Sequence, residues 1–173
     1  MDFFEAVEKR YSHKERFLPD PVPVDDLKKI AKAGLTSPTG NNSQNVKIVI
    51  LPDREAVKVI SDIVSTDGTT TAPAAVVIFT DKNMRGNHPD FDLENYSAAT
   101  QNVLLAATAL GYSSLWLDYP FIDTNNQQNA LKALNAPDGL TLRVFIPIGK
   151  PDGEGSRRSK IPLEERLFYK KFS

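Results

Sequence analysis

Helical spacing of hydrophobic residues recurs in several parts of the chain. Asp2 and Glu5 have the spacing of a capping box, which predicts a short helix that ends near Arg10. Apolar positions at i, i+3, i+4, i+7 and i+8 predict a second helix, which must end before Pro38 because a residue before proline disfavours helical geometry. These positions are Leu27, Ile30, Ala31, Gly34 and Leu35.

Three further helices follow from the same pattern. Asp53 is the predicted N-cap of one, and its apolar face comprises Val57, Ile60, Ile63 and Val64. The longest is predicted over 93–110 and ends at Gly111, a residue suited to a left-handed cap. Because this helix is rich in alanine and apolar nearly all round, we expect it to be the central core helix. The last is predicted over 124–134.

Four segments have the composition of β-strands. Val46–Leu51 is rich in β-branched residues, and 74–80 is a nearly continuous apolar run, as expected for a strand buried on both faces. The other two predicted strands are 113–117 and 140–148. Pro147 indicates that the last strand ends there or lies at a sheet edge.

Helices and strands interleave, so we expect a layered α/β sandwich with about four or five strands. The length of 173 residues suits a single domain that covers 1–173. The polar segment 81–92 is predicted to be a long loop, and a short helix is predicted from Pro162.

Composition excludes several kinds of protein. The chain has 21 Lys and Arg against 22 Asp and Glu, a net charge of −1, which argues against a general nucleic-acid or membrane binder. It has no cysteine and only two histidines, His13 and His88, so thiolate chemistry and a multi-histidine metal site are excluded. The acidic N-terminal segment differs from a secretory signal, and no apolar stretch is long enough to span a membrane, so we expect a cytoplasmic protein.

Two basic segments are candidates for anion binding. Arg10, Ser12 and Lys14 share one face if their segment is extended, and their side chains suit a phosphate or the edge of a heteroaromatic ring. A solvated basic turn is the alternative, and spacing alone favours it. The cations within 157–160 also suit a phosphate dianion, although such a cluster is more often a solvated surface.

A loop and a short strand supply the other candidates. Pro38, Thr39, Asn42 and Gln44 belong to a loop whose amides, hydroxyl and glycine suit the amide-like edge of a planar ligand, and an ordinary turn is equally supported. Trp116 is the sole tryptophan; packing is its usual role, but the backbone there can still face a ligand. Glycine-rich dinucleotide and P-loop motifs are absent.

Taken in order, these segments resemble the nitroreductase family of flavoproteins. The family's R-x-S-x-[RK] motif corresponds to residues 10–14, and its P-S-x-N-x-Q loop corresponds to 38–44. Its alanine-rich Q-N-x-L-L-A-A-x-x-L-G helix corresponds to 101–111, and its [KR]-x-[RK]-x-P-L run to 158–163. The resemblance therefore covers essentially the whole chain.

The resemblance implies a layered α-β-α sandwich, an α/β or α+β fold, with a mostly antiparallel central sheet. It also implies that FMN binds non-covalently at the interface of a homodimer. Positions matching Arg10, Ser12 and Lys14 would contact the flavin's pyrimidine edge, ribityl chain and phosphate. Positions matching Arg158 and Lys160 would hold the phosphate.

Other implied contacts involve the loop and the short strand. Pro38, Thr39, Asn42 and, in many relatives, the counterpart of Gln44 would arrive from the partner subunit. Backbone near Trp116 and Leu117 would lie beside the flavin's reactive ring. The implied activity is hydride transfer from NAD(P)H through FMN to a nitroaromatic, quinone or similar oxidant. We assign no catalytic side chain, because the flavin carries that chemistry.

Three departures from the family pattern bear on this interpretation. Asn45-Val46 stands where many relatives have Pro-Trp, and Thr39 replaces the commoner serine. The chain is short for the family, which leaves 81–92 as the candidate cover over the flavin. A flavin-binding or regulatory module without fast turnover is therefore an alternative function, and a structural domain without cofactor is a third.

Overall fold

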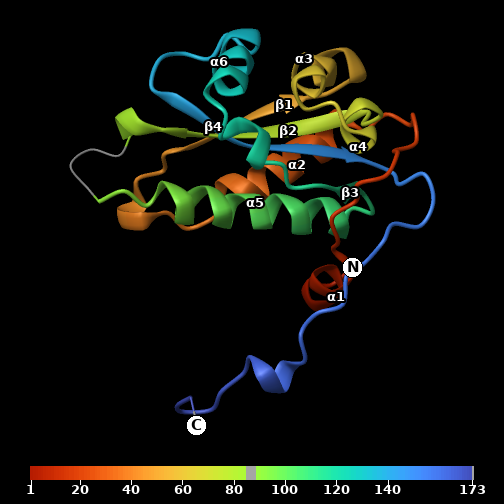
Figure 1. Cartoon of the computed structure of the whole chain (residues 1–173), viewed down its shortest axis with the longest axis vertical. Helices are drawn as coiled ribbons and strands as arrows, with labels where there is room; N and C mark the ends of the chain where they lie inside the picture. The colour runs from red at the N-terminus through yellow and green to blue at the C-terminus, as the bar shows by residue number, and fades with distance from the viewer. Residues whose placement is uncertain (85–88, 173) are drawn as a thin grey trace.

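The computed structural model describes residues 1–84 and 89–172 (Figure 1). Its helices are α1 (Phe3–Lys9), α2 (Val24–Leu35), α3 (Arg54–Val64), α4 (Asp67–Thr70), α5 (Asp92–Ala109) and α6 (Thr124–Ala133). Its strands are β1 (Val46–Leu51), β2 (Ala74–Asp81), β3 (Ser113–Ser114) and β4 (Leu140–Gly149). Short 3-10 turns are η1 (Gly40–Asn42), η2 (Lys82–Met84), η3 (Tyr119–Phe121) and η4 (Leu163–Glu165).

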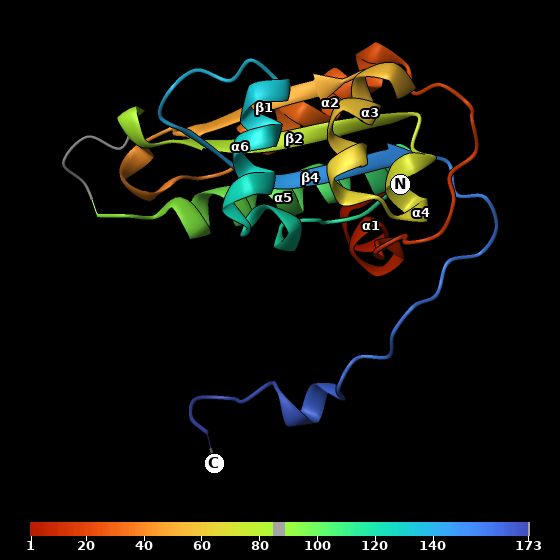
Figure 2. The ribbon, with the colours of Figure 1, turned by 45° about the horizontal axis from the view of Figure 1, so that its top comes forward.

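Within the described residues, the four strands form one sheet in the order β1-β2-β4-β3. Each ladder is antiparallel: β1 pairs with β2, β2 with β4, and β4 with β3. In Figure 2, α3, α4 and α6 lie on one face of this sheet, while α2 and α5 lie on the other. The predicted α-β-α sandwich with a mostly antiparallel central sheet is therefore confirmed.

Strand β2 lies at the centre of two hydrophobic cores. Its residues alternate between the faces: Ala74, Val76 and Ile78 pack on the α2 and α5 side, whereas Ala75, Val77 and Phe79 pack on the α3 and α6 side. All six side chains are excluded from water. This two-sided burial explains why the segment is apolar without interruption.

The alanine content of α5 suggested a central core helix, but the structure places this helix in an outer layer, on one face of the sheet. Its inner face packs on the sheet and on α2, but Leu93 is 62% exposed and Leu110 is 38% exposed. Alanine allows close packing on the inner side, while the outer side of the helix is only partly buried. Gly111 ends the helix in the left-handed conformation, with φ of 83°, as predicted.

The prediction that β4 ends or lies at an edge at Pro147 is wrong. Strand β4 continues to Gly149 and lies between β2 and β3. Phe145 exchanges two backbone hydrogen bonds with Leu117 on the β3 side, and residues two apart in a strand face the same way. The Pro147 nitrogen therefore faces the gap between β3 and Leu117, where regular pairing is interrupted and no donor is needed. Because pairing is interrupted there, only Ser113–Ser114 of the predicted strand 113–117 forms a strand, and Leu117 makes an isolated bridge.

Other segments differ from prediction in length. The helix expected from Pro162 is only the turn η4, and the short helix α4 was not predicted. The loop was predicted over 81–92, but Asp81 belongs to β2, 82–84 form η2, and Asp92 begins α5. Residues 85–88, which include His88, lie outside the described residues. In the described part of the chain, no helix is both long and apolar enough to cross a membrane.

The two ends of the chain expose their apolar side chains. In Figures 1 and 2 the C-terminal segment runs away from the sheet. Asp2 caps α1 by accepting a hydrogen bond from the Glu5 N–H at 2.9 Å, as predicted. However, Phe4 on this helix is 76% exposed and Phe172 in the tail is 87% exposed. These apolar side chains remain exposed, although Ala6 on the inner side of α1 is buried.

Neighbouring residues of α3 provide a test of the packing. Ile60 is fully buried, whereas Val59 is 39% exposed. Replacing Ile60 with alanine should lower the free energy of unfolding by about 2–5 kcal/mol, because it removes buried methyl groups and leaves a cavity. Val59→Ala should change it by less than about 1 kcal/mol, and urea titration would measure both. Equal losses in the two variants would contradict the observed orientation of α3.

Candidate functional site

The two basic segments that the sequence singled out meet in one pocket. Its volume is about 670 Å³, and its lining includes Arg10, Ser12 and Lys14 together with Arg158 and Lys160 of the C-terminal tail. These groups are separated by almost the whole chain, yet the tail passes beside α1 after leaving β4 (Figure 1). The structure thus brings together five of the predicted site residues.

The segment after α1 is extended, as predicted. Arg10 leaves the helix with φ of −62° and ψ of 128°, and Ser12 forms a parallel bridge with Ser114 of β3. The His13 N–H donates to the Ser114 carbonyl at 3.0 Å. Consequently Arg10, Ser12 and Lys14 reach the pocket, whereas the His13 side chain is fully buried.

His13 helps to hold this segment in place. Its Nε2 lies 2.9 Å from the Arg16 carbonyl oxygen, and its Nδ1 lies 3.3 Å from the Tyr11 hydroxyl. Its ring also packs against Phe17 at a centroid distance of 4.7 Å. Within residues 1–84 and 89–172, no group of three or more His, Asp or Glu side chains could hold a metal ion. The contacts with Tyr11, Arg16 and Phe17 make His13 an anchor for the basic segment.

Positive charge dominates the pocket. Its charged lining consists of the cations Arg10, Lys14, Arg157, Arg158 and Lys160 and the carboxylates Glu8 and Glu15. Backbone N–H groups of Glu15 and Lys14 donate to the Glu15 carboxylate and hold its pKa below the usual range. Arg10, Lys14, Arg158 and Lys160 make no side-chain hydrogen bond or ion pair to any described residue. The pocket is therefore suited to an anion.

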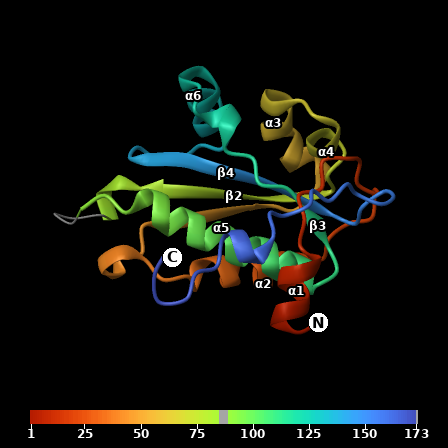
Figure 3. The same ribbon diagram turned by 60° about the horizontal axis from the view of Figure 1, so that its bottom comes forward.

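The predicted loop with Pro38, Thr39, Asn42 and Gln44 lies elsewhere. The Gly40 N–H donates to the Asn95 side chain at 2.7 Å, which places the loop at the start of α5. Helix α1 and the tail, which both contribute to the basic pocket, lie near the other end of α5 (Figures 1 and 3). Eighteen helical residues span about 27 Å. One chain therefore does not bring this loop to the pocket.

The loop has an unusual backbone for its residue types. Asn41, Asn42 and Gln44 all have positive φ, between 49° and 54°. Asparagine tolerates this left-handed conformation, but glutamine adopts it less often. The Gln44 N–H donates to the Thr39 hydroxyl at 3.1 Å, which helps to maintain the turn. Such a conformation persists only where surrounding contacts impose it.

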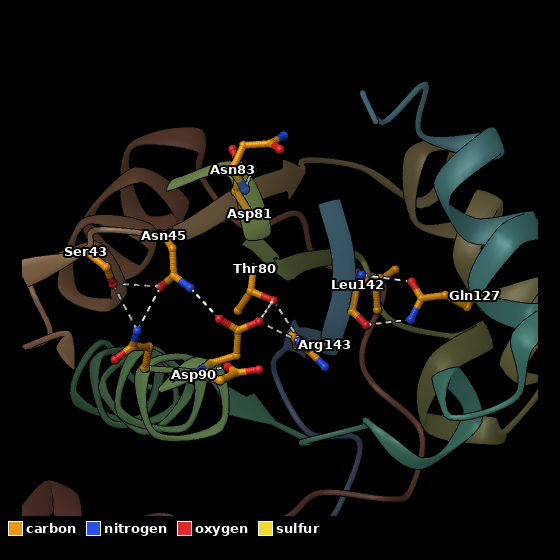
Figure 4. Close-up of polar contacts among 11 residues, drawn as sticks. Ser43, Asn45, Thr80, Asp81, Asn83, Asp90, Gln127, Leu142 and Arg143 are labelled. Atoms are coloured by element: carbon orange, nitrogen blue, oxygen red, sulfur yellow. Dashed lines mark hydrogen bonds and ion pairs between the residues drawn. The ribbon is translucent and has the colours of Figure 1, made fainter. Parts of the chain in front are cut away.

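A buried polar network holds the end of this loop (Figure 4). Asn95 donates to the Asn45 side-chain oxygen at 2.9 Å and to the Ser43 hydroxyl at 3.2 Å. Asn45 in turn donates to Asp92 at 2.6 Å. Asn45 and Asn95 are almost fully buried, so these bonds tie the end of the loop to the first turn of α5.

The same network continues into the sheet. Arg143 of β4 donates to Asp92 at 2.8 Å and to the Thr80 hydroxyl of β2 at 2.8 Å. Thr80 also donates to Asp92 at 3.2 Å. Asp92 therefore joins the loop, α5 and two strands. Asn45, noted as a departure from the family pattern, contributes to this network and does not reach the basic pocket.

Trp116 and Leu117 follow β3 but do not line the pocket. Trp116 is partly buried and packs on the core beside α2 and α5. Leu117 packs on the opposite core and exchanges backbone hydrogen bonds with Phe145. They are connected to the pocket only indirectly: they follow β3, whose Ser114 pairs with the pocket residue Ser12.

Comparison with known proteins identifies the family. The nitroreductase family model matches residues 7–82 and 61–150. A protein of Archaeoglobus fulgidus, provisionally named NADH dehydrogenase/NAD(P)H nitroreductase, is 32% identical over 136 residues, which cover 77% of this chain and 76% of that protein. The chain belongs to the nitroreductase family. The family predicted from the sequence motifs is thus confirmed.

Two further nitroreductase relatives extend the comparison. A Methanothermobacter thermautotrophicus protein with the same provisional name is 26% identical over 160 residues, which cover 91% of this chain and 82% of that protein. A provisional nitroreductase from Desulfovibrio desulfuricans was solved in complex with FMN. It is 25% identical and aligns over 100% of this chain and 99% of its own, with a TM-score of 0.84.

Some site features of this nitroreductase were missed in the sequence. Tyr11 and Glu15 line or border the basic pocket, and Asp92 and Arg143 support the loop from distant segments. The departure at Asn45 was a signal, but its partners at 92 and 95 lie far away in the sequence. Local spacing does not predict such contacts.

Replacing Asn45 with alanine should lower the free energy of unfolding by about 1–3 kcal/mol, because Asn95 and Asp92 would each lose a buried partner. Asn125→Ala is a matched control, since Asn125 is exposed on α6 and alanine favours helix. Chemical denaturation would compare the two variants. If Asn45→Ala were as stable as Asn125→Ala, the network would not support the loop.

Proposed function

We propose that this nitroreductase-family chain is an FMN-dependent NAD(P)H oxidoreductase that reduces a nitroaromatic, quinone or similar small oxidant. When bound, FMN would supply the redox chemistry by accepting hydride from NAD(P)H and passing electrons to the oxidant. The observation that carries this proposal is the convergence of Arg10, Lys14, Arg158 and Lys160 on one pocket.

The residues of this pocket fit the phosphate end of FMN. The volume of about 670 Å³ lies within the range of small-molecule sites, roughly 300–1,000 Å³. Arg158 and Lys160 can donate charge-assisted hydrogen bonds to phosphate oxygens, and the Ser12 hydroxyl can donate to, or accept from, the ribityl chain. The Desulfovibrio desulfuricans structure in complex with FMN supports this assignment, as do the names of the two curated relatives.

The chain's part in the reaction is to bind and orient the cofactor. Arg10 and Lys14 add positive charge from the segment that follows α1, where they can stabilise negative charge on a bound flavin. The resemblance places Trp116 and Leu117 beside the reactive ring, and this role remains a proposal. We assign no side chain as acid or base.

We further propose that the working unit is a homodimer. The loop with Pro38, Thr39, Asn42 and Gln44 is separated from its own pocket by the length of α5, so a second copy must supply it if it contacts FMN. Exposed apolar side chains support this arrangement. They are Phe3, Phe4 and Val7 of α1, Leu93 of α5, and Leu167, Phe168, Tyr169 and Phe172 of the tail.

The exposed pocket also motivates the alternative of a flavin-binding module without fast turnover. Ser12, Lys14, Arg158 and Lys160 are all exposed in this chain. An absorption spectrum of the purified protein with FMN and steady-state NAD(P)H oxidation with an added quinone distinguish the proposals. We expect a yellow protein that turns over; binding without turnover would favour the module, and no binding would contradict both. The cytoplasmic location and the single domain over 1–173 also remain proposals.

The tail cations give a direct test of the phosphate assignment. Arg158→Ala and Lys160→Ala should each raise the FMN dissociation constant roughly tenfold or more, because a hydrogen bond to a charged group contributes about 1.5–3 kcal/mol. Arg54→Ala removes the same charge from α3 on the opposite face of the sheet and should leave FMN affinity unchanged. Unchanged constants for both tail variants would remove the tail from the phosphate site.

The dimer proposal predicts complementation between two defective chains. One chain would carry Arg158→Ala with Lys160→Ala, and the other would carry Asn42→Gly with Gln44→Gly, which keeps the left-handed backbone without the side chains. Mixed dimers should regain one tight FMN site per dimer, because one intact pocket meets one intact loop. Affinity-tagged mixed dimers and fluorescence titration would measure this.

The outcome differs if the loop acts within its own chain. Each site of the mixed dimer would then contain one defect, and no tight site would return. Light scattering that reports a monomer with FMN fully bound would also contradict the proposed arrangement.

A further inference from the structure

The C-terminal tail crosses the basic segment at Tyr11. Beyond β4, the Asp152 N–H donates to the Arg16 carbonyl at 2.9 Å, and from there the tail is largely exposed. Gly155 then passes directly against the Tyr11 ring, so closely that an added methyl group would overlap the ring carbons. Only glycine allows the tail to approach Tyr11 in this way.

Arg157 holds the tail at the same point. Its guanidinium lies over the Tyr11 ring, 5.1 Å from the centroid. Its Nη1 donates to the Glu8 carbonyl at 2.9 Å, and its Nη2 donates to the Lys9 carbonyl at 2.5 Å. These carbonyls belong to the last turn of α1, where helical partners are missing. The planar guanidinium can make both hydrogen bonds and the ring contact at once.

The three cations within 157–160 therefore have different roles. Arg157 is engaged with α1 and Tyr11, whereas Arg158 and Lys160 have no side-chain partner in the part of the chain that is described. Beside them, the Ser156 backbone N–H also helps to lower the pKa of Glu15. Arg157 and Tyr11 are thus the main attachment of the tail beside the pocket.

We propose that Tyr11 and Arg157 form a clamp that positions Arg158 and Lys160 for the phosphate of FMN. Both are positioning residues, and the proposal rests on the proposed FMN function. Without the clamp, binding would have to order this exposed stretch of tail. Ordering the backbone of a single residue is enough to weaken binding by roughly tenfold. The clamp removes this cost before the ligand arrives.

Riboflavin, which lacks the phosphate, is the probe that separates the clamp from general damage to the fold. Tyr11→Leu and Arg157→Ala should raise the FMN dissociation constant roughly tenfold and leave that of riboflavin unchanged. Tyr11→Leu is informative because tyrosine carries no positive charge and its hydroxyl is engaged with His13 and Ser113. Gly155→Ala disturbs the same crossing from the tail side and should give the same selective loss. Circular dichroism and thermal melting would show that each variant is folded.

Arg157→Lys distinguishes positioning from direct phosphate binding. Lysine keeps the charge but cannot bond both α1 carbonyls and lie flat on Tyr11, so the clamp predicts a loss close to that of Arg157→Ala. In addition, Arg157→Ala should cost nothing further when Arg158 and Lys160 are already alanine. Arg166→Ala, which removes a cation from the same tail outside the pocket, should leave the FMN-to-riboflavin affinity ratio unchanged.

Contrary results have distinct meanings. If Arg157→Lys retains full FMN affinity, or if Arg157→Ala costs the same in both backgrounds, Arg157 binds phosphate itself and the clamp is overturned. A selective loss in Arg158→Ala without one in Tyr11→Leu and Gly155→Ala would also overturn it while leaving the FMN proposal intact. If the unmodified protein binds riboflavin as tightly as FMN, the phosphate assignment fails, and the clamp with it.

Discussion

The length of α5 is the constraint on which the arrangement of the site depends. The first turn of this 18-residue helix is bonded to the loop through the polar network. Its last turn leads into β3, which pairs with the basic segment. A rigid element of this length keeps the two candidate half-sites apart within one chain. Any ligand that contacts both must therefore lie between two copies, and the exposed apolar side chains of α1, α5 and the tail are consistent with such an association.

The arginines of this protein show how position decides the use of one residue type. Arg143 is paired with Asp92 in a largely buried network, where its charge stabilises the junction between α5 and the sheet. Arg157 is bonded to helix carbonyls and to an aromatic ring. Arg158 has no side-chain partner among the described residues and faces the pocket. A charge that is already satisfied supports the fold, whereas an unsatisfied one can bind an anion.

Burial of β2 on both faces provides the frame for this arrangement. With six successive residues excluded from water, helices must cover both sides of the sheet, and the ends of the strands remain for polar functions. The network around Asp92 lies at one end, near Thr80. The basic pocket lies toward the other, near Ser114, which pairs with Ile148 of β4. The core thus holds the two polar regions at fixed positions without contributing to either.

The amino-acid sequence by itself determined the family, the kind of fold and most elements. Strand β1 and helix α3 were predicted with the observed bounds or nearly so, because the period of apolar residues reports local burial. The predictions of a strand end or edge at Pro147 and of a central position for α5 were wrong, because a local pattern does not show which segments pack beside it. Only the tertiary structure decided that Arg10 meets Arg158, that Arg157 is occupied by α1, and that the loop lies at the far end of α5. These contacts join residues that are distant in the chain, and no local periodicity encodes them.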